Sequence, residues 1–271
     1  MTTERARATP KSSLQPPVRG KANSSDIEER QRDRCFQCNR SKATCFCGFV
    51  RPFKTRTHFV ILMHPKEYKH EKVGTGRLTK LSLPNSEIIT TDDLPRNRRL
   101  NELLADSCFH PVLLYPGPDS VNLSENGTLA VPERKELLVL VIDGTWSLAK
   151  KMMRLATNLH SLPRVCFTPS SRSRFLIKQQ PHEHCLSTIE AVYFLLDVLD
   201  RQGYERLEGR HAVLPEILDK IVAFQIKCAA DPNLPSYRHK KNYTAAENRK
   251  PAKKWETRSL YFRGNGLIPP E

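Results

Sequence analysis

The sequence feature that most constrains the fold is a run of six apolar residues at 137–142, placed between Glu136 and Asp143. Uninterrupted apolar runs of this length are typical of strands that lie inside a sheet and are covered on both faces. Shorter apolar stretches predict further strands at 58–63, 88–89, 112–115 and 165–167. We therefore expect a sheet with 137–142 as its central strand.

Segments with apolar residues at helical spacing alternate with these predicted strands. They predict helices at 100–105, 146–157, 187–202 and 214–229. Pro, Gly, Asn, Asp and Ser at 116–135 predict a long loop. Asp92, Asp93 and Pro95 precede the first helix and predict an acidic cap for it. Strands that alternate with helices predict an α/β fold with a mostly parallel sheet flanked by helices. In such folds ligands bind beyond the carboxyl ends of the strands.

Composition divides the 271 residues into four parts. Residues 1–33 hold few apolar side chains, and we expect a disordered tail there. Residues 34–56 contain four cysteines and are interpreted as a small zinc-binding module, followed by a catalytic domain at 57–230. Residues 231–271 form a basic extension rich in aromatic side chains.

The net charge of +15 is concentrated outside the central part of the chain. Residues 57–230 carry 22 basic and 20 acidic side chains, whereas 35–56 carry five basic and none acidic, and 231–271 carry nine and four. Clustered positive charge attracts a polyanion, which favours a nucleic-acid partner. The alternative is that these segments are only solvated tails.

Nothing in the sequence predicts a membrane partner, because no run of about 18 apolar residues could span a bilayer. The first residues also lack the apolar segment of a secretory signal. We expect a soluble intracellular protein, located in the cytoplasm, or in the nucleus if the source is eukaryotic. The sequence leaves the oligomeric state open.

The four early cysteines form two close pairs, Cys35 with Cys38 and Cys45 with Cys47. Two such pairs joined by a short loop can place four thiolates around one zinc ion. Metal binding would stabilise a segment too small to fold on apolar burial alone. Disulfides are the alternative, but they are typical of secreted proteins. The remaining cysteines, at positions 108, 166, 185 and 228, are interpreted as small buried apolar residues.

Polar residues follow the first predicted strand. His64 and Glu67 come directly after it, and Gly74-Thr75-Gly76-Arg77 follow as a glycine turn with free backbone donors. Each signal is weak alone, since His64 could be a structural residue at the strand end and the glycines could only reverse the chain.

Asp143-Gly144-Thr145-Trp146 follow the central strand and form the sharpest candidate site. The Asp143 carboxylate comes directly after a strand, which is the place where an α/β fold presents catalytic groups. Trp146 could form the wall of a pocket for a cationic or planar ligand. The structural alternative is that Thr145 caps the next helix and Asp143 assists it.

Two later segments add candidate binding groups. Arg172 and Arg174 lie in a serine-rich loop and suit a phosphate or a carboxylate. Ser187 and Glu190 have capping-box spacing and are expected to begin a helix, whose N-terminal N–H groups could also face a ligand. In the final extension, cations alternate with aromatic residues, a pattern that suits RNA through phosphate contacts and base stacking.

The ordered combination of these motifs over about 35–225 resembles the DTW-domain family. The shared elements are the cysteine pairs, His64 with Glu67, 75–77, Asp143 to Trp146, and 186–191. This resemblance implies a SPOUT-like knotted α/β fold, with the knot near the C-terminus. It also implies a tRNA-uridine aminocarboxypropyltransferase, which moves the 3-amino-3-carboxypropyl group of S-adenosyl-L-methionine to uridine N3 and releases 5′-methylthioadenosine.

The resemblance also suggests residue roles. Asp143 is the candidate base for the uridine N3 proton, or else it binds the ammonium of the transferred group. Trp146 would pack near the sulfonium, so these two are the catalytic candidates. The expected cofactor-binding residues are Thr75, Gly76, Ile142, Thr145, Leu186, Ser187, Thr188 and Ala191, and the expected RNA-binding residues are Arg77, Arg172, Arg174, Lys240, Lys241, Lys253 and Lys254.

Two other functions remain open from the sequence. An RNA methyltransferase would use the same cofactor with the opposite regiochemistry. A non-catalytic protein that binds zinc and RNA would leave Asp143 structural, but a nearly neutral α/β body with a carboxylate and a tryptophan at a strand end exceeds what RNA binding requires.

Overall fold

The computed structural model describes residues 34–70, 74–125, 127–178 and 185–230, and two short strands further on. These two strands, β7 Phe262–Arg263 and β8 Gly266–Leu267, pair in antiparallel fashion. The predicted tail at 1–33 and nearly all of the predicted extension at 231–271 lie outside the described residues.

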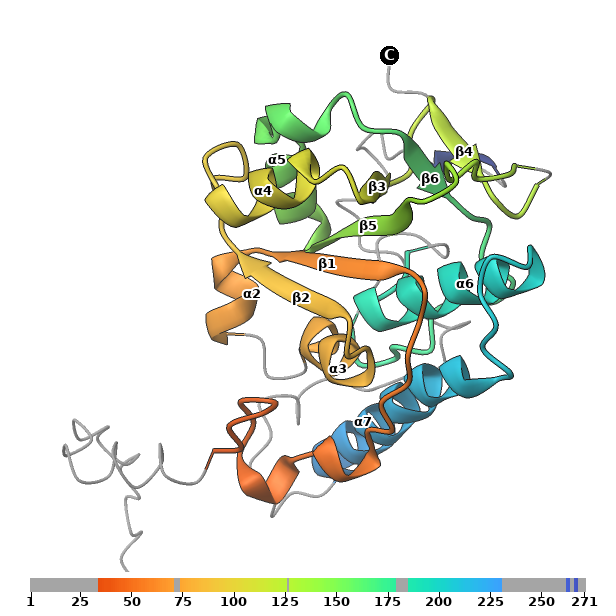
Figure 1. The fold of residues 1–271 in the computed structure, drawn as a ribbon. Helices are drawn as coiled ribbons and strands as arrows, with labels where there is room; N and C mark the ends of the chain where they lie inside the picture. The colour runs from red at the N-terminus through yellow and green to blue at the C-terminus, as the bar shows by residue number, and fades with distance from the viewer. Residues whose placement is uncertain are drawn as a thin grey trace, which may run out of the picture.

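A six-stranded sheet forms the centre of the molecule, in the order β2-β1-β5-β3-β6-β4 (Figure 1). Every neighbouring pair in this sheet is parallel, which confirms the predicted α/β fold. The strands are β1 His58–Met63, β2 Ser86–Thr90, β3 Phe109–Leu114, β4 Ser120–Asn122, β5 Glu136–Asp143 and β6 Arg164–Cys166.

Strand β5 lies between β1 and β3, as its apolar run predicts. Its residues from Leu137 to Val141 are all buried, because helices cover both faces of the sheet at this position. Since all the strands run parallel, their carboxyl ends meet at one edge, and the register pairs Met63 at the end of β1 with Asp143 at the end of β5.

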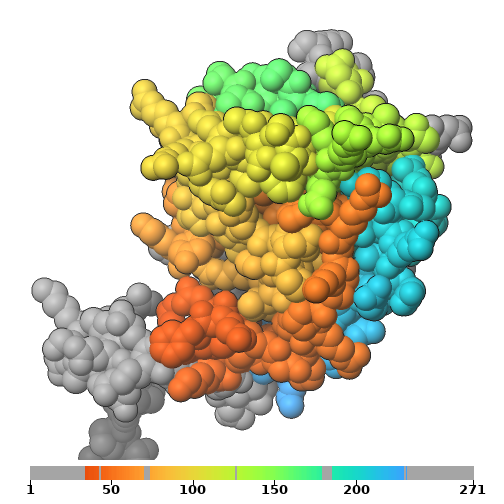
Figure 2. All heavy atoms as spheres, viewed as in Figure 1, coloured from red at the N-terminus to blue at the C-terminus, as the bar shows by residue number. Residues whose placement is uncertain are grey.

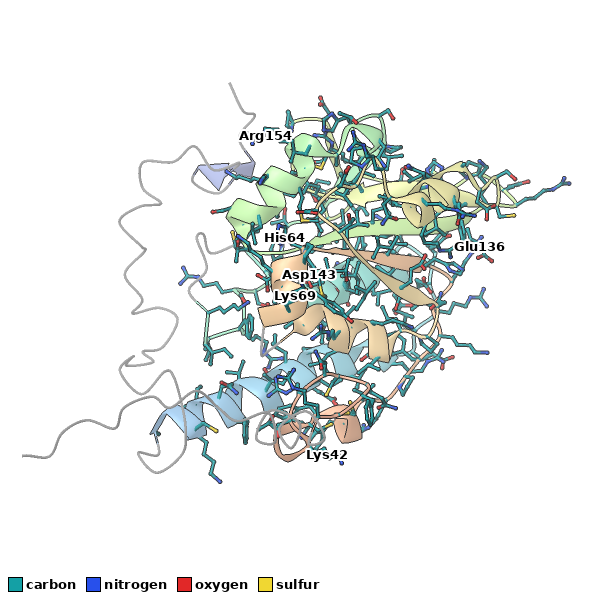
Figure 3. The ribbon with its side chains drawn as sticks, turned by 90° about the vertical axis from the view of Figure 1, so that its left-hand side faces the viewer. Lys42, His64, Lys69, Glu136, Asp143 and Arg154 are labelled. Carbon is teal, nitrogen blue, oxygen red and sulfur yellow. The ribbon has the colours of Figure 1, made fainter. Side chains whose placement is uncertain are left out.

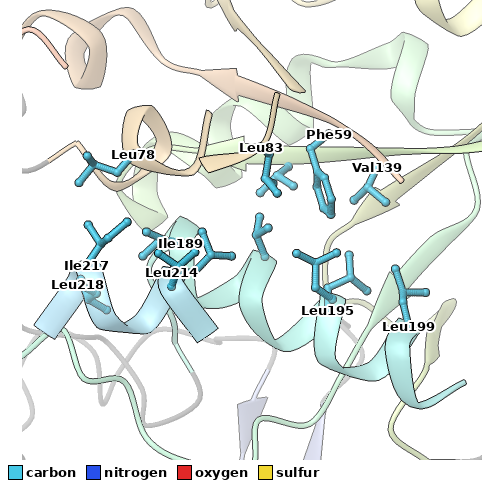
Figure 4. Close-up of a cluster of buried hydrophobic side chains, with 14 of the residues drawn as sticks. Phe59, Leu78, Leu83, Val139, Ile189, Leu195, Leu199, Leu214, Ile217 and Leu218 are labelled. Atoms are coloured by element: carbon cyan, nitrogen blue, oxygen red, sulfur yellow. The ribbon is translucent and has the colours of Figure 1, made fainter. Parts of the chain in front are cut away.

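Helices cover the two faces of the sheet in separate groups (Figure 1). Leu100 of α4 and Met152 of α5 pack on one face, and α3, α6 and α7 cover the other. Figure 4 shows this second face, where Leu195 and Leu218 lie below Phe59 of β1. The helices are α2 Pro65–His70, α3 Thr75–Ser82, α4 Arg98–Ala105, α5 Trp146–Leu155, α6 Thr188–Arg201 and α7 Val213–Ala230, with short 3-10 turns η1 Lys42–Thr44, η2 Cys47–Phe49, η3 Thr157–Leu159 and η4 Arg210–Ala212.

Three local expectations differ from the structure. The expected loop at 116–135 contains β4, a three-residue edge strand too short to give an alternating pattern. Asn97 caps α4 by accepting a hydrogen bond from the Leu100 N–H at 2.9 Å, so the expected acidic cap at Asp92 and Asp93 is wrong. The expected glycine turn at 74–77 is instead the start of α3, with Gly74 as its N-cap.

The cysteine-rich segment 34–56, here called the zinc module, packs against the rest of the chain. Phe46 and Phe53 are buried in the same core as α6 and α7. The ring of Phe46 meets the edge of Phe224 on α7, with their centroids 5.8 Å apart. Figure 2 shows the module as the red and orange surface at the lower edge of the molecule. Its position relative to the sheet is therefore fixed by apolar contacts as well as by the chain.

The domain boundaries and the C-terminal knot stay predictions. Within the described part of the chain, no helix is long and apolar enough to cross a membrane.

Candidate active site

The candidate site is built around Asp143, the last residue of β5, at the carboxyl edge of the sheet. Its backbone carbonyl accepts a hydrogen bond from the His64 N–H at 3.0 Å, which ties the end of β5 to the residue that follows β1. The Asp143 side chain is half-buried. The most apolar strand of the chain thus ends in a carboxylate that its neighbours hold in place.

Helix α6 fixes the orientation of this carboxylate. The Thr188 hydroxyl donates a hydrogen bond to Asp143 Oδ1 at 2.6 Å, although 45 residues separate the two in sequence. Thr188 is the first residue of α6, so this hydrogen bond joins the start of the helix to the end of the central strand. A bond of this length to an ionised acceptor belongs to the stronger class of protein hydrogen bonds.

Helix α3 approaches the same carboxylate through Gly76. A Cβ atom at this position would overlap Asp143 Oδ2 and would lie 2.9 Å from Met63 Cε. The Asp143 carboxylate is held by Thr188, so it has little freedom to make room. Glycine is therefore required at position 76 by the close approach of α3 to the site.

Three helix N-termini converge on Asp143. Helix α3 begins at Thr75, α5 begins at Trp146 and α6 begins at Thr188. The N-terminus of a helix presents unpaired N–H groups and a partial positive charge, which favours anionic groups. The arrangement offers a carboxylate for a cationic group and several helix N-termini for an anionic one, within one site.

The segment 144–146 forms the turn from β5 into α5. Thr145 caps the helix by accepting a hydrogen bond from the Leu148 N–H at 3.4 Å, as the structural alternative for this residue has it. A Cβ atom at Gly144 would meet His64 Cβ at 3.7 Å, so the turn packs against the end of β1. The half-buried Trp146 follows directly as the first residue of α5.

His64 lies beneath this turn and is buried, with 7% of its surface exposed. Burial lowers the pKa of its imidazole, Lys66 and Lys151 lower it further, and Asp92 acts in the opposite direction. Its Nδ1 accepts a hydrogen bond from the Lys66 N–H at 3.1 Å. His64 is thus a neutral side chain at pH 7, fixed by the first turn of α2.

Glu190 organises the start of α6. It forms the predicted capping box with Ser187, whose N–H donates to Glu190 Oε2 at 2.9 Å. The same carboxylate accepts hydrogen bonds from the Ser173 hydroxyl at 2.9 Å and from the Arg174 N–H at 2.6 Å. One buried carboxylate therefore caps the helix and anchors the loop at 172–174 to it.

The three arginines expected to bind RNA lie in different surroundings. Arg77 is buried, its guanidinium donates to the Tyr68 carbonyl at 2.5 Å and lies 4.2 Å from the centroid of the Tyr68 ring. Arg77 thus joins α3 to α2. Arg172 and Arg174 are exposed, and Arg174 pairs with Asp219 of α7 at 3.1 Å. Both line a groove of about 620 Å³ together with Ser173, Leu176, Asp219, Val222, Ala223 and Ile226.

The four cysteines of the zinc module come together as predicted. The Sγ atoms of Cys35 and Cys47 are 3.7 Å apart, as are those of Cys38 and Cys45, and all four lie within 4.8 Å of one another. Four sulfurs placed tetrahedrally at the usual zinc distance would be about 3.8 Å apart. A hydrogen bond from the Cys38 N–H lowers the pKa of the Cys35 thiol to about 6, whereas burial raises the pKa of the Cys38 and Cys47 thiols. The geometry and the donor set therefore fit a zinc ion.

The other cysteines agree only in part with their expected burial. Cys166 and Cys185 are buried as predicted, and Cys228 is half-buried. Cys108 is exposed, so the prediction is wrong for this residue. Cys108 lies in the turn after α4, where its own N–H donates a hydrogen bond to Asp106 Oδ1. This turn keeps Cys108 at the surface, although the apolar strand β3 begins at the next residue.

A family model of the DTW domain matches residues 32–226, which include the cysteine cluster and the whole Asp143 site. The chain belongs to the DTW domain family. The match also covers every described element from the zinc module to most of α7, so the DTW domain comprises the sheet and both helical layers. No solved structure matches the chain.

Curated relatives of this DTW protein carry the name tRNA-uridine aminocarboxypropyltransferase. The mouse enzyme 2 is 32% identical over 178 residues, covering 64% of the chain and 58% of the relative. The enzyme 2 of Macaca fascicularis is 28% identical over 179 residues, with 65% and 59% covered. The Arabidopsis thaliana enzyme A is 28% identical over 223 residues, with 73% and 82% covered. The chain thus spans less than two thirds of the length of the two mammalian relatives.

The DTW fold brings together some of the predicted site residues and separates others. Asp143, Gly76 and Thr188 meet at the carboxyl edge, with Thr75, Thr145, Trp146 and Ser187 on the helix starts around them. Ile142 precedes Asp143 on β5, while Leu186 and Ala191 flank the start of α6. The predicted RNA-binding lysines Lys240, Lys241, Lys253 and Lys254 lie outside the described residues.

Sequence reasoning missed two features of the DTW domain. It gave no sign that Thr188 would reach Asp143, because hydrogen bonds between distant segments leave no local pattern. It also missed the cations near His64, since Lys66 on α2 and Lys151 on α5 are far apart in sequence. Both are exposed. Figure 3 shows Lys69 just below His64 and Asp143, with Arg154 at the top of the molecule.

Proposed function

We propose that this protein is a tRNA-uridine aminocarboxypropyltransferase. It transfers the 3-amino-3-carboxypropyl group of S-adenosyl-L-methionine to N3 of a tRNA uridine, and 5′-methylthioadenosine leaves. The proposal is supported by the family match over 32–226 and by the names of relatives in animals and plants. Because several relatives are considerably longer than the matched segment, the activity of the whole protein is part of this proposal.

The observation that carries the proposal is the convergence of three helix N-termini on the carboxylate of Asp143. The group to be transferred contains both an ammonium and a carboxylate. A carboxylate side chain suits the ammonium, and helix N-termini suit the carboxylate. The predicted cofactor-binding residues on α3, α5 and α6 occupy these helix starts, so the site has the donors and acceptors that such a co-substrate needs.

The bound co-substrate supplies an electrophilic carbon next to a positively charged sulfur. Uridine N3 must lose its proton to attack this carbon, and Asp143 is placed either to accept that proton or to hold the ammonium of the transferred group. In the transfer, the new N–C bond forms as the C–S bond breaks, and sulfur leaves with the electron pair as a neutral thioether. Trp146, the first residue of α5, would pack beside the cationic sulfur.

The residues around Asp143 would contribute to catalysis by fixing the orientation of its carboxylate. Thr188 holds the carboxylate in one orientation, and the absence of a side chain at Gly76 allows α3 to approach it. His64 is neutral and adds no charge to the site. Direct transfer between two bound substrates gains most of its rate from such positioning.

A zinc ion bound by Cys35, Cys38, Cys45 and Cys47 would have a structural role. All four ligand positions would be filled by cysteine, which is typical of structural rather than catalytic zinc. The ion would fix a segment that otherwise has little core of its own. Phe46 then carries the stabilisation into the DTW domain through its contact with Phe224.

The decisive experiment is incubation of the purified protein with unmodified tRNA and S-adenosyl-L-methionine, followed by mass analysis of the nucleosides. We expect aminocarboxypropyluridine together with 5′-methylthioadenosine. A methylated nucleoside together with adenosylhomocysteine would assign the methyltransferase activity instead. The absence of any modified nucleoside, with folded protein and several tRNAs, would refute the transferase proposal.

A further inference from the structure

The zinc module contains four phenylalanines, of which two are buried, Phe49 is 46% exposed and Phe36 is the most exposed. Phe46 and Phe53 are buried, and the Lys220 ammonium lies 4.7 Å from the ring centroid of Phe49. Phe36 is 97% exposed. An aromatic ring held this far into solvent contributes nothing to the core, and its faces are accessible to a planar ligand.

The loop that presents Phe36 is tightly constrained. The Cys35 N–H donates to the Arg40 carbonyl at 2.7 Å, and the Asn39 N–H donates back to the Cys35 carbonyl at 2.8 Å. Asn39 adopts a left-handed φ of 57° that closes the loop. Phe36 therefore sits between two predicted zinc ligands on a backbone with few alternatives, and a ligand that covers its ring would order little additional chain.

Electrostatics select the class of ligand. Residues 34–56 include no acidic side chain, and Arg34, Lys42, Arg51 and Lys54 are exposed there. In Figure 3, Lys42 lies at the lower edge of the molecule, below Lys69 and Asp143. An exposed aromatic ring among cations suits a polyanion that carries planar bases, because phosphates meet the cations while a base covers the ring.

We propose that Phe36 is a stacking platform for an unpaired base of the RNA substrate, with Lys42 contacting a phosphate. The zinc module would then hold the tRNA while a uridine occupies the site at Asp143. This inference rests on the proposed function for the identity of the RNA. It assigns the module a role in substrate binding in addition to the structural role of zinc.

The test measures the affinity of the holoprotein for an unmodified tRNA transcript, without co-substrate, at several salt concentrations. Phe36→Leu keeps an apolar side chain but removes the flat ring, and we expect tRNA affinity to fall by about tenfold. Phe36→Trp keeps a flat aromatic ring and should bind tRNA with wild-type affinity. Phe49→Leu is the matched control in the same module and should bind tRNA as the wild type does, because Phe49 is about half as exposed as Phe36 and the Lys220 ammonium already lies over its ring.

Two further measurements separate stacking from general attraction. The salt dependence of binding should be unchanged in Phe36→Leu, whereas Lys42→Ala should lower its slope by about one. With a fully paired RNA duplex, Phe36→Leu and wild type should bind equally, since no free base is available. Zinc content, measured for each variant, should stay at the wild-type level because Phe36 is almost fully exposed.

Wild-type tRNA affinity in Phe36→Leu would overturn the inference, and so would an equal loss of affinity for the duplex. If the substitution left tRNA binding intact but changed the oligomeric state, Phe36 would be assigned to a protein contact instead. Because binding is measured without turnover, this result is independent of the transferase assay. Failure to form a modified nucleoside would refute the proposed activity, while loss of tRNA binding in Phe36→Leu would still support the stacking role.

Discussion

Replacement of Thr188 by valine tests whether the fixed orientation of Asp143 matters for catalysis. Valine has nearly the same shape and is also β-branched, so α6 should still begin at the same residue. The substitution removes the 2.6 Å hydrogen bond to Asp143 Oδ1. Hydrogen bonds to charged groups contribute about 1.5–3 kcal/mol, which corresponds to a loss of roughly 10- to 150-fold if the whole bond is needed in the transition state.

The assay is the formation of aminocarboxypropyluridine on tRNA at saturating co-substrate. We expect kcat of Thr188→Val to fall by at least about tenfold, while the melting temperature falls by only several degrees and the protein stays folded at the assay temperature. Thr188→Ser keeps the hydroxyl and should recover most of the activity.

A double-mutant cycle identifies the partner through which Thr188 acts. If Thr188 acts through the carboxylate, Asp143→Asn combined with Thr188→Val should be no slower than Asp143→Asn alone. Additive losses in the double variant would refute the reasoning, and so would wild-type kcat in folded Thr188→Val.

Four further outcomes are expected. Asp143→Asn should lose most turnover while its circular dichroism and melting temperature stay near wild type; near-normal turnover would exclude both roles considered for the carboxylate. Gly76→Ala should lose activity and about 1–3 kcal/mol of unfolding free energy, measured by urea titration, because the added methyl overlaps the Asp143 carboxylate. Metal analysis of protein purified without chelators should find about one zinc per chain. Cys38→Ser should lower both the zinc content and the melting temperature. Native protein that contains no zinc would contradict the predicted zinc site. Burial lowers the pKa of His64, so folding favours the neutral imidazole. This contribution to the free energy of unfolding is complete above the unfolded pKa near 6.5 and is lost as the pH falls through the lower pKa of the folded protein. His64→Gln should therefore flatten the fall in melting temperature between about pH 7 and 5, and an unchanged profile would exclude the effect.

The strands of the sheet and the main helices were predictable because their signals are local. The apolar run before Asp143 requires burial on both faces, which only an interior strand provides. The capping box of Ser187 and Glu190 is formed within a single helical turn. The cysteine spacing brings four ligand atoms together over a short segment, whichever way the rest of the chain folds.

Where local signals are short or ambiguous, sequence reasoning failed. Strand β4 has three residues and gains its place only by pairing with β6. The glycines at 74 and 76 resemble a turn, but packing of α3 against Asp143 makes Gly76 part of a helix. Arg77 resembles an exposed cation, yet the Tyr68 carbonyl and ring bury it.

The sequence by itself determined that this chain forms a parallel α/β sheet, that Asp143 ends its central strand, and that four cysteines gather near the N-terminus. Only the tertiary structure decided which groups surround that carboxylate. Thr188 reaches it because α6 packs against the sheet beside β5, and Gly76 reaches it because α3 does the same beside β1. The physical reason is that strand and helix signals depend on neighbours along the chain, whereas a site depends on strand order and helix packing between distant segments.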